Sequence, residues 1–321
     1  MKNIQKDFSN SAHQNFDSIQ QSLTELLHEV KMASNNGYQN LLNSNSWGKH
    51  YHKLTTEELF VMNLNDKEIL GILNLAIYQS ILQNDYSHLI NGIFTYSRLR
   101  LLNRAYVSGV SDWLVVESLV TNDTELQNLE YTKSLNFNND TLFDTVSLLG
   151  GNLLKTILIK PDFKSQTIEQ YSKLIGDVKS KFDNAFLQYL YGLTTDNYEL
   201  CKTSFEQIEQ LYKRCQWLAT GWYREANLNK ELPIFVLGLY QLKNFTNSNF
   251  DFDIRNEFLK NVKQFTVDNP NYKPKLFMQF DGELNFLNDI LTNNFTSFYI
   301  NYKIKINEIK TPANLPEERE R

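Results

Sequence analysis

Side chains that could hold a metal are few, and their spacing does not complete a site. Of the five histidines, His50 and His52 stand closest together, in "KHYHK". Imidazole nitrogens are common ligands of transition metals, but no second cluster of His, Cys or carboxylates stands at a spacing that would add the remaining ligands. We therefore expect no metal and no cofactor.

Sequence motifs of common enzyme classes are also missing. The chain has no Gly-rich phosphate loop, no nucleophile elbow and no zinc-protease helix motif. The basic pair Lys213 and Arg214 in "YKRCQW" is interpreted as the solvated face of a helix rather than as a phosphate site. We expect no catalytic residues and do not predict an enzyme, although an enzyme of unrecognised type stays an alternative.

Two stretches carry residues that could bind a partner. In "NFDFDIRNEF", Asp251, Asp253 and Glu257 could share a surface, with a solvated loop as the default and a partner-binding patch as the alternative. The aromatic residues Trp222 and Tyr223 lie in "QWLATGWYREANLNKELPIF". Such residues are usually core, but aromatic anchors also dominate binding grooves. These five residues are our candidate binding residues.

Composition favours a helical protein. The 321 residues include 12 Gly and 6 Pro, few of the residues that punctuate sheets and loops, and 41% are hydrophobic, enough to fill a large core. The net charge of -5 argues against neutralisation of phosphates as a binding mode, so no nucleic-acid partner is expected and a basic partner would be better matched.

The predicted compartment is the cytoplasm. Cys201 and Cys215 stand on one predicted helix, roughly 21 Å apart, which is too far for a disulfide. The start has no apolar core of signal-peptide length, and the longest apolar stretch, "PIFVLGLY", is far shorter than a membrane span of about 20 residues. We expect a soluble, cytoplasmic protein without membrane association.

One short phrase recurs along the chain. "ILQNDYSHLI", "SLVTNDTELQNL" and "YGLTTDNYELCK" align on Asp85, Asp123 and Asp196, and "LIKPDFKS" adds Asp162. The intervals of 38, 39 and 34 residues match helix-pair repeats. Each aspartate is predicted to cap the N-terminus of a helix, and Glu199 would complete an approximate capping box with Asp196. The predicted fold is all-α, with helical-hairpin repeats in an α-solenoid or a bundle.

Helical periodicity extends this prediction. After Asp85 one apolar stripe is expected, and after Asp196 another; the two comprise Tyr86, Leu89, Ile90, Ile93 and Phe94, and Cys201, Phe205, Ile208, Tyr212 and Cys215. Residues 1–52 are assigned to an N-terminal amphipathic helix and a polar linker, 53–310 to the helical-repeat domain and 311–321 to a flexible tail. A last helix is expected from Phe295 to Ile309, with a strand at "YKIKI" as the alternative.

Residues 183–245 contain three motifs in sequence: an apolar helix that ends in the turn "LTTDN", a long helix that reaches "YKRCQW", and "ELPIFVLGLY", which opens another apolar helix. With these motifs the segment resembles the immunity protein 49 family of bacterial polymorphic toxin systems. Residues 111–129 fit the upstream half of that family, so the likeness covers about 100–250. The chain has Thr195 where the family commonly has Gly.

The resemblance implies a mostly helical, non-catalytic protein that binds and neutralises one cognate toxin. It carries over no toxin-contact residue by position. A basic nuclease would suit the acidic balance. The alternative function is a helical-repeat scaffold or regulator that binds a peptide. The neighbouring gene would separate the two, because an immunity protein is encoded beside its toxin.

Overall fold

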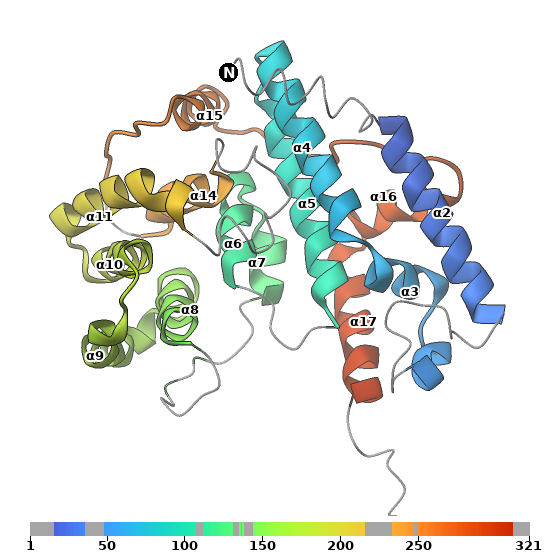
Figure 1. Cartoon of the computed structure of the whole chain (residues 1–321), viewed down its shortest axis with the longest axis horizontal. Coiled ribbons are helices and arrows are strands. Elements are labelled where there is room, and N and C mark those ends of the chain that lie inside the picture. The colour runs from blue at the N-terminus through green and yellow to red at the C-terminus, as the bar shows by residue number, and fades with distance from the viewer. Residues whose placement is uncertain are drawn as a thin grey trace, which may run out of the picture. The chain divides into compact units, whose positions relative to one another are not determined.

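The described part of the chain is built from helices. The computed structural model describes residues 16–35, 48–106, 112–130, 135, 137, 144–215, 233–246 and 250–310. Within these residues every regular element is a helix and no strand occurs (Figure 1). The predicted all-α class is confirmed. The alternative strand at "YKIKI" is wrong, because those residues lie inside helix α17 (Phe295–Lys310).

The chain divides into two compact units. Unit 1 combines Met1–Val110 with Lys275–Arg321, and unit 2 is Ser111–Pro274. The residues assigned by sequence to one helical-repeat domain, 53–310, therefore contribute to both units. The predicted tail, 311–321, lies outside the described residues, as do most of the predicted N-terminal linker and the candidates Trp222 and Tyr223.

Unit 1 begins with the predicted amphipathic helix. The apolar face of α2 (Phe16–Asn35) is buried and packs on α3 (Thr56–Asn63) and α4 (Asp66–Gln83); it comprises Ile19, Leu23, Leu26, Leu27 and Val30. Helix α4 pairs with α5 (Ser87–Arg104). The two helices can approach closely because Gly92 has no Cβ atom; a Cβ there would collide with Ala76. The remaining elements are η1 (Gly48–Lys53), η7 (Gly282–Leu284), α16 (Phe286–Ile290) and α17.

Helix α5 is buried on every side, although its sequence predicts one apolar stripe. Residues from Leu89 to Asn103 are all buried, polar side chains included. The extra cover comes from the C-terminal part of unit 1. The Lys275 and Phe277 N–H groups donate to Asn91 and Thr95, and the Leu291 carbonyl accepts from Arg98, whose guanidinium also lies over the ring of Phe295 at the start of α17. Sequence periodicity missed this contact because it joins residues more than 180 positions apart.

Unit 2 holds the other helices. They are α6 (Asp112–Ser118), η2 (Leu119–Thr121), α7 (Thr124–Glu130), α8 (Thr145–Leu158), η3 (Pro161–Phe163), α9 (Lys164–Leu174), η4 (Ile175–Asp177), α10 (Lys181–Thr195), α11 (Tyr198–Leu211), η5 (Tyr212–Arg214), α14 (Ile234–Leu242), η6 (Lys243–Phe245) and α15 (Glu257–Asp268). The consecutive pairs α6 with α7, α8 with α9 and α10 with α11 are in contact, while α14 returns to α6. A Cβ at Gly238 would collide with the Val116 carbonyl. A regular repeat stack stays a prediction.

The recurring phrase marks the place where one helix ends and the next begins, and two adjacent residues make that boundary. Asn84, Asn122 and Asp196 adopt the left-handed conformation, with φ of 53°, 52° and 56°, and are the only such non-glycine residues in the described chain. Asn and Asp tolerate this region better than other side-chain-bearing residues. At Asp123 the predicted cap is confirmed, because its carboxylate accepts from the Leu126 N–H at 3.1 Å. Asp85 accepts from the Ser87 N–H at 2.9 Å, but it stands one residue before the N-cap position of α5, Tyr86, which has no side-chain cap hydrogen bond.

The other two predicted caps are wrong. Asp196 is the left-handed residue that ends α10, and Asn197 caps α11 by accepting from the Leu200 N–H at 3.1 Å. The predicted capping box at Asp196 and Glu199 therefore does not form. Asp162 lies inside the short η3 helix, and α9 starts without a side-chain cap. Aligning on aspartate alone concealed that "TND" and "TDN" place their caps one residue apart.

Candidate functional site

Three of the candidate residues lie on or directly after an extended segment of unit 2, residues 250–256, which we call the strap. Burial alternates along it: Phe252 and Ile254 are 5% and 3% exposed, while Asp251, Asp253 and Arg255 face solvent. This alternation is the period-two pattern of an extended chain lying on a surface. The strap therefore presents Asp253 away from a packed face.

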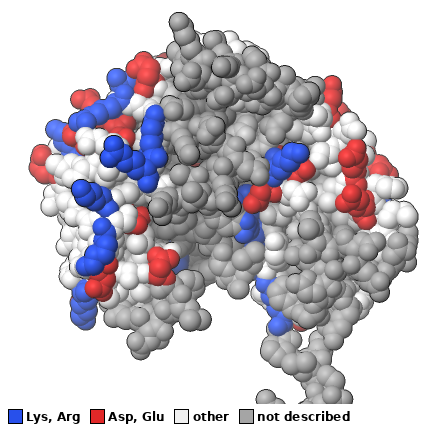
Figure 2. Space-filling view, in the orientation of Figure 1, with Lys and Arg blue, Asp and Glu red and all other residues white. Residues whose placement is uncertain are grey.

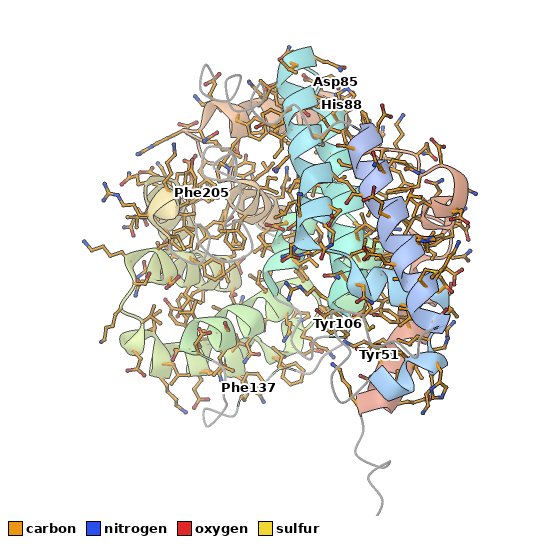
Figure 3. All side chains as sticks on the ribbon, turned by 45° about the vertical axis from the view of Figure 1, so that its right-hand side comes forward. Tyr51, Asp85, His88, Tyr106, Phe137 and Phe205 are labelled. Atoms are coloured by element: carbon orange, nitrogen blue, oxygen red, sulfur yellow. The ribbon has the colours of Figure 1, made fainter. Side chains whose placement is uncertain are left out.

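An aromatic cluster fixes the inner side of the strap. The Phe252 ring centroid lies 5.1 Å from that of Phe205 on α11, 5.8 Å from Tyr240 on α14 and 6.1 Å from Tyr189 on α10. Phe205, labelled in Figure 3, is fully buried among the side chains of unit 2. Offset and edge-to-face ring pairs add specificity to the area they bury. Three helices thus hold one ring of the strap.

A charged network fixes the first half of the strap. Asp251 Oδ1 accepts from Tyr240 Oη at 2.8 Å, from Lys243 Nζ at 3.0 Å and from Lys263 Nζ at 3.1 Å. Lys243, itself 8% exposed, also donates to the Phe250 carbonyl at 2.8 Å. The Tyr198 hydroxyl donates to the Asp251 carbonyl at 3.0 Å. The carboxylate of Asp251 therefore binds the strap to α14, η6 and α15 of the same unit, although it faces solvent.

The pKa values follow from this network. Partial burial alone would raise the pKa of Asp251, but hydrogen bonds from Lys243, Tyr240 and Lys263 outweigh it and hold that pKa below its usual range. Burial, together with the hydrogen bond to Asp251 and the charge of that carboxylate, raises the pKa of Tyr240. Asp251 is thus ionised at neutral pH and Tyr240 is protonated, as their hydrogen bond requires.

The second half of the strap is held by α11. The backbone N–H groups of Arg255 and Asn256 donate to Glu209 at 3.0 Å and 3.1 Å. The Arg255 guanidinium donates to Glu206 at 2.8 Å. Asn256 then caps α15 by accepting from the Leu259 N–H at 3.1 Å. The backbone on both sides of Asp253 is therefore held in place.

The candidate acids fall into two kinds. Asp251 serves the internal network, whereas Asp253 is exposed and makes no hydrogen bond or ion pair with the described residues. Glu257 opens α15 and, among the described residues, forms one ion pair, at 3.8 Å from Lys260, with 75% of its side chain exposed. Asp253 and Glu257 thus remain available to a partner. Sequence reasoning missed Tyr240, Lys243 and Glu209. The i, i+3 spacing of Tyr240 and Lys243 could have indicated that their side chains lie near each other, whereas Glu209 gave no such signal.

Within the part of the chain that the structure describes, the histidines belong to no group that could hold a metal. No group of three or more His, Cys, Asp or Glu that could hold a metal ion occurs within the described residues. His88 lies beside Asp85 near the turn between α4 and α5 (Figure 3), with 3.9 Å between His88 Nε2 and Asp85 Oδ2. Lys213 and Arg214 are exposed. The side chains of His13 and His50 lie outside what the structure describes.

Unit 1 contains a separate buried polar cluster. Glu58 on α3 accepts both the Thr55 N–H at 2.7 Å and Lys305 Nζ from α17 at 2.8 Å. Burial and the neighbouring Tyr106 raise the pKa of Tyr51 to about 12, and both tyrosines are labelled in Figure 3. Lys305 satisfies a carboxylate that is 5% exposed. The cluster joins distant parts of unit 1 and has a structural explanation.

Comparisons with known proteins do not place the chain in a family: no family model, no curated protein and no solved structure matches it. The resemblance to the immunity protein 49 family therefore stays a prediction. Within the described residues, no helix combines the length and apolar character that a membrane crossing requires.

Proposed function

We propose that this protein is an immunity protein that binds and neutralises a cognate secreted antibacterial toxin without chemical catalysis. The observation that carries the proposal is the strap, which presents exposed Asp253 from a backbone fastened on both sides. A contact residue held before binding loses little conformational entropy when the complex forms. The resemblance over residues 183–245 supplies the class of partner.

The charges of the strap favour a basic partner. Asp253 and Glu257 add negative charge without an internal counter-ion of short distance, whereas Asp251 is neutralised by two lysines. Charges of both signs are interspersed over the described part of the face in Figure 2, so local charges rather than a broad acidic field would recognise the toxin. Opposite charges across an interface accelerate association and select the partner. We propose a basic toxin, such as a nuclease, met in the cytoplasm.

The test is to co-express the product of the neighbouring gene with this protein. We expect survival of the producing cell and co-purification of a stoichiometric complex. Asp253→Lys and Glu257→Lys should each slow association by roughly tenfold at low salt, because they place like charges against a basic surface. Asp177→Lys, a reversal at another exposed acid of unit 2, is the matched control. A toxic partner that is neither bound nor blocked would refute the proposal.

A second function is favoured by one specific observation. Residues 275–280 form a non-helical segment with a bend at Phe277 and Met278, and side chains of α5 accept from its Lys275 and Phe277 N–H groups, as a peptide-binding helical scaffold would bind a ligand. The regular hairpin stack predicted from the repeats would provide such a scaffold. Binding of many unrelated extended peptides, with no neighbouring toxin, would favour this function over immunity.

A further inference from the structure

The C-terminal part of unit 1, residues 275–310, covers helix α5 in the way a bound ligand would; we call these residues the arm. In its non-helical beginning, Leu276, Met278 and Phe280 are buried in alternation with more exposed neighbours. The Lys275 N–H donates to Asn91 Oδ1 at 3.1 Å and the Phe277 N–H donates to Thr95 Oγ1 at 2.9 Å.

The spacing explains why α5 can hold an extended chain. Asn91 and Thr95 are four residues apart on a helix, a rise of about 6 Å. Lys275 and Phe277 are two residues apart on an extended chain, an advance of about 6.6 Å. Asn91 and Thr95, on successive turns of α5, are therefore in register with the N–H groups of Lys275 and Phe277.

The rest of the arm continues the same contact. Arg98, 4% exposed and one turn after Thr95, donates to the Leu291 carbonyl at 2.8 Å and stacks 4.3 Å from the Phe295 ring centroid. Helix α17 adds the Lys305 ion pair with Glu58. Every one of these contacts joins residues 16–106 to the arm through noncovalent bonds alone.

The connection that precedes the arm is exposed. After α15 ends at Asp268, residues 269–271, Lys273 and Lys275 face solvent, whereas Tyr272 and Pro274 are half-buried; the segment "NPNYKPK" contains Pro270 and Pro274. The two prolines cannot donate hydrogen bonds and interrupt helix. This connection leads from unit 2 into the arm, whose first residue, Lys275, donates its N–H to Asn91 of α5.

We propose that the arm is an exchangeable element, so that the arm of one copy can seat on α5 of a second copy and form a reciprocal dimer. All contacts of the arm are the same in both arrangements, because the second copy presents an identical α5. Such an exchange leaves the free energy of docking the arm on α5 nearly unchanged, so the fraction of dimer depends on the protein concentration. This interaction is independent of toxin binding.

The test uses the full chain with the recognition sequence of a site-specific protease inserted between Lys273 and Pro274. After cleavage under native conditions, we expect the arm fragment to co-elute with the remainder. A fluorescently labelled synthetic peptide of residues 275–310 should then replace it when the two are mixed in urea just below the unfolding midpoint and diluted. Fluorescence anisotropy measures the incorporated peptide.

Substitutions on α5 test the assigned contact. Thr95→Val removes the acceptor of the Phe277 N–H and should weaken peptide incorporation by about tenfold, whereas Thr95→Ser keeps the hydroxyl and should restore it. Thr203→Val, at an exposed threonine of unit 2 that bonds only its own helix, is the matched control. Equal incorporation in Thr95→Val and wild type would overturn the assigned register.

The uncut protein tests the second copy as occupant. Light scattering after refolding over a range of protein concentrations should show a dimer whose fraction rises with concentration. A chain that refolds only as a monomer at every concentration would overturn the dimer. Release of the arm fragment from a folded remainder on cleavage, or no peptide incorporation after mixing in urea just below the unfolding midpoint and dilution, would overturn recognition of the arm itself.

Discussion

Replacing Phe252 by alanine tests whether the strap is a fixed part of unit 2. The side chain is 5% exposed and its ring meets those of Phe205, Tyr240 and Tyr189. A buried aromatic side chain removes 150 to 250 Å² from water, which at about 25 cal/mol per Å² gives an upper bound of about 4 to 6 kcal/mol. Measured truncations of buried Phe cost about 3 to 5 kcal/mol. We expect Phe252→Ala to lower the free energy of unfolding of unit 2 by about 3 to 5 kcal/mol.

The assay is urea unfolding followed by far-ultraviolet circular dichroism. Phe250→Ala is the matched control on the same strap, because Phe250 is only half-buried and pairs with a single ring, that of Tyr198 at 5.4 Å. It should cost about 1 kcal/mol. If Phe252→Ala cost no more than Phe250→Ala, the strap would not be fastened through its inner ring. The preorganisation argument for Asp253 would then fail with it.

Three further predictions rest on single groups. Asp196→Gly should stabilise the protein by up to about 1 kcal/mol, because glycine adopts the left-handed conformation without strain. Asn197→Ala should destabilise it by about 1 kcal/mol, because the cap of α11 is lost. Opposite signs in thermal unfolding would contradict the assignment of the left-handed position to Asp196 and of the cap to Asn197. Glu58→Ala should cost about 3 kcal/mol, because it strands Lys305 and removes a capping box, and urea midpoints comparable to wild type would disprove this. The folded-state pKa of Asp251 lies below the unfolded value of about 3.9, so the stability that its carboxylate contributes is present above that pH and is lost as pH falls through the folded pKa. Asp251→Asn should therefore lower the free energy of unfolding at pH 7 and have no effect in strong acid. A difference in unfolding free energy that stays constant across a pH series would contradict the network.

The sequence could predict what depends on local periodicity. Cys201, Phe205 and Ile208 of the predicted stripe are buried on one side of α11. Tyr212 and Cys215 are buried as well, but the predicted single helix is wrong there, because α11 ends at Leu211 and these two residues lie in and directly after η5. The turns at Asp85 and Asp123 are also predictable from local sequence, because the recurring phrase separates two apolar helical segments. Asp196 shows the limit: "TTDN" contains two residues suited to either a left-handed position or a cap, and only the backbone decides which takes which.

The candidate acids could be located but not ranked from sequence. "NFDFDIR" shows the period-two alternation of an extended chain, which indicates that Phe252 and Ile254 share one face and the acids the other. It cannot show that Lys243 and Lys263 converge on Asp251, because these lysines reach it from a preceding turn and a following helix. The two equivalent acids of the pattern thereby acquire different roles.

The burial of α5 illustrates why the division into units escaped the sequence. Asn91, Thr95 and Arg98 read as the solvated side of an amphipathic helix, since no neighbouring residue could satisfy them. Buried polar groups require partners, and here the partners are backbone groups at Lys275, Phe277 and Leu291. Backbone N–H and C=O groups carry no side-chain signature, so a contact made through them leaves no trace in composition or periodicity. A helix that looks half-exposed can therefore be central whenever an extended segment far along the chain supplies those groups, and in this protein that segment is the arm whose exchange we propose to test.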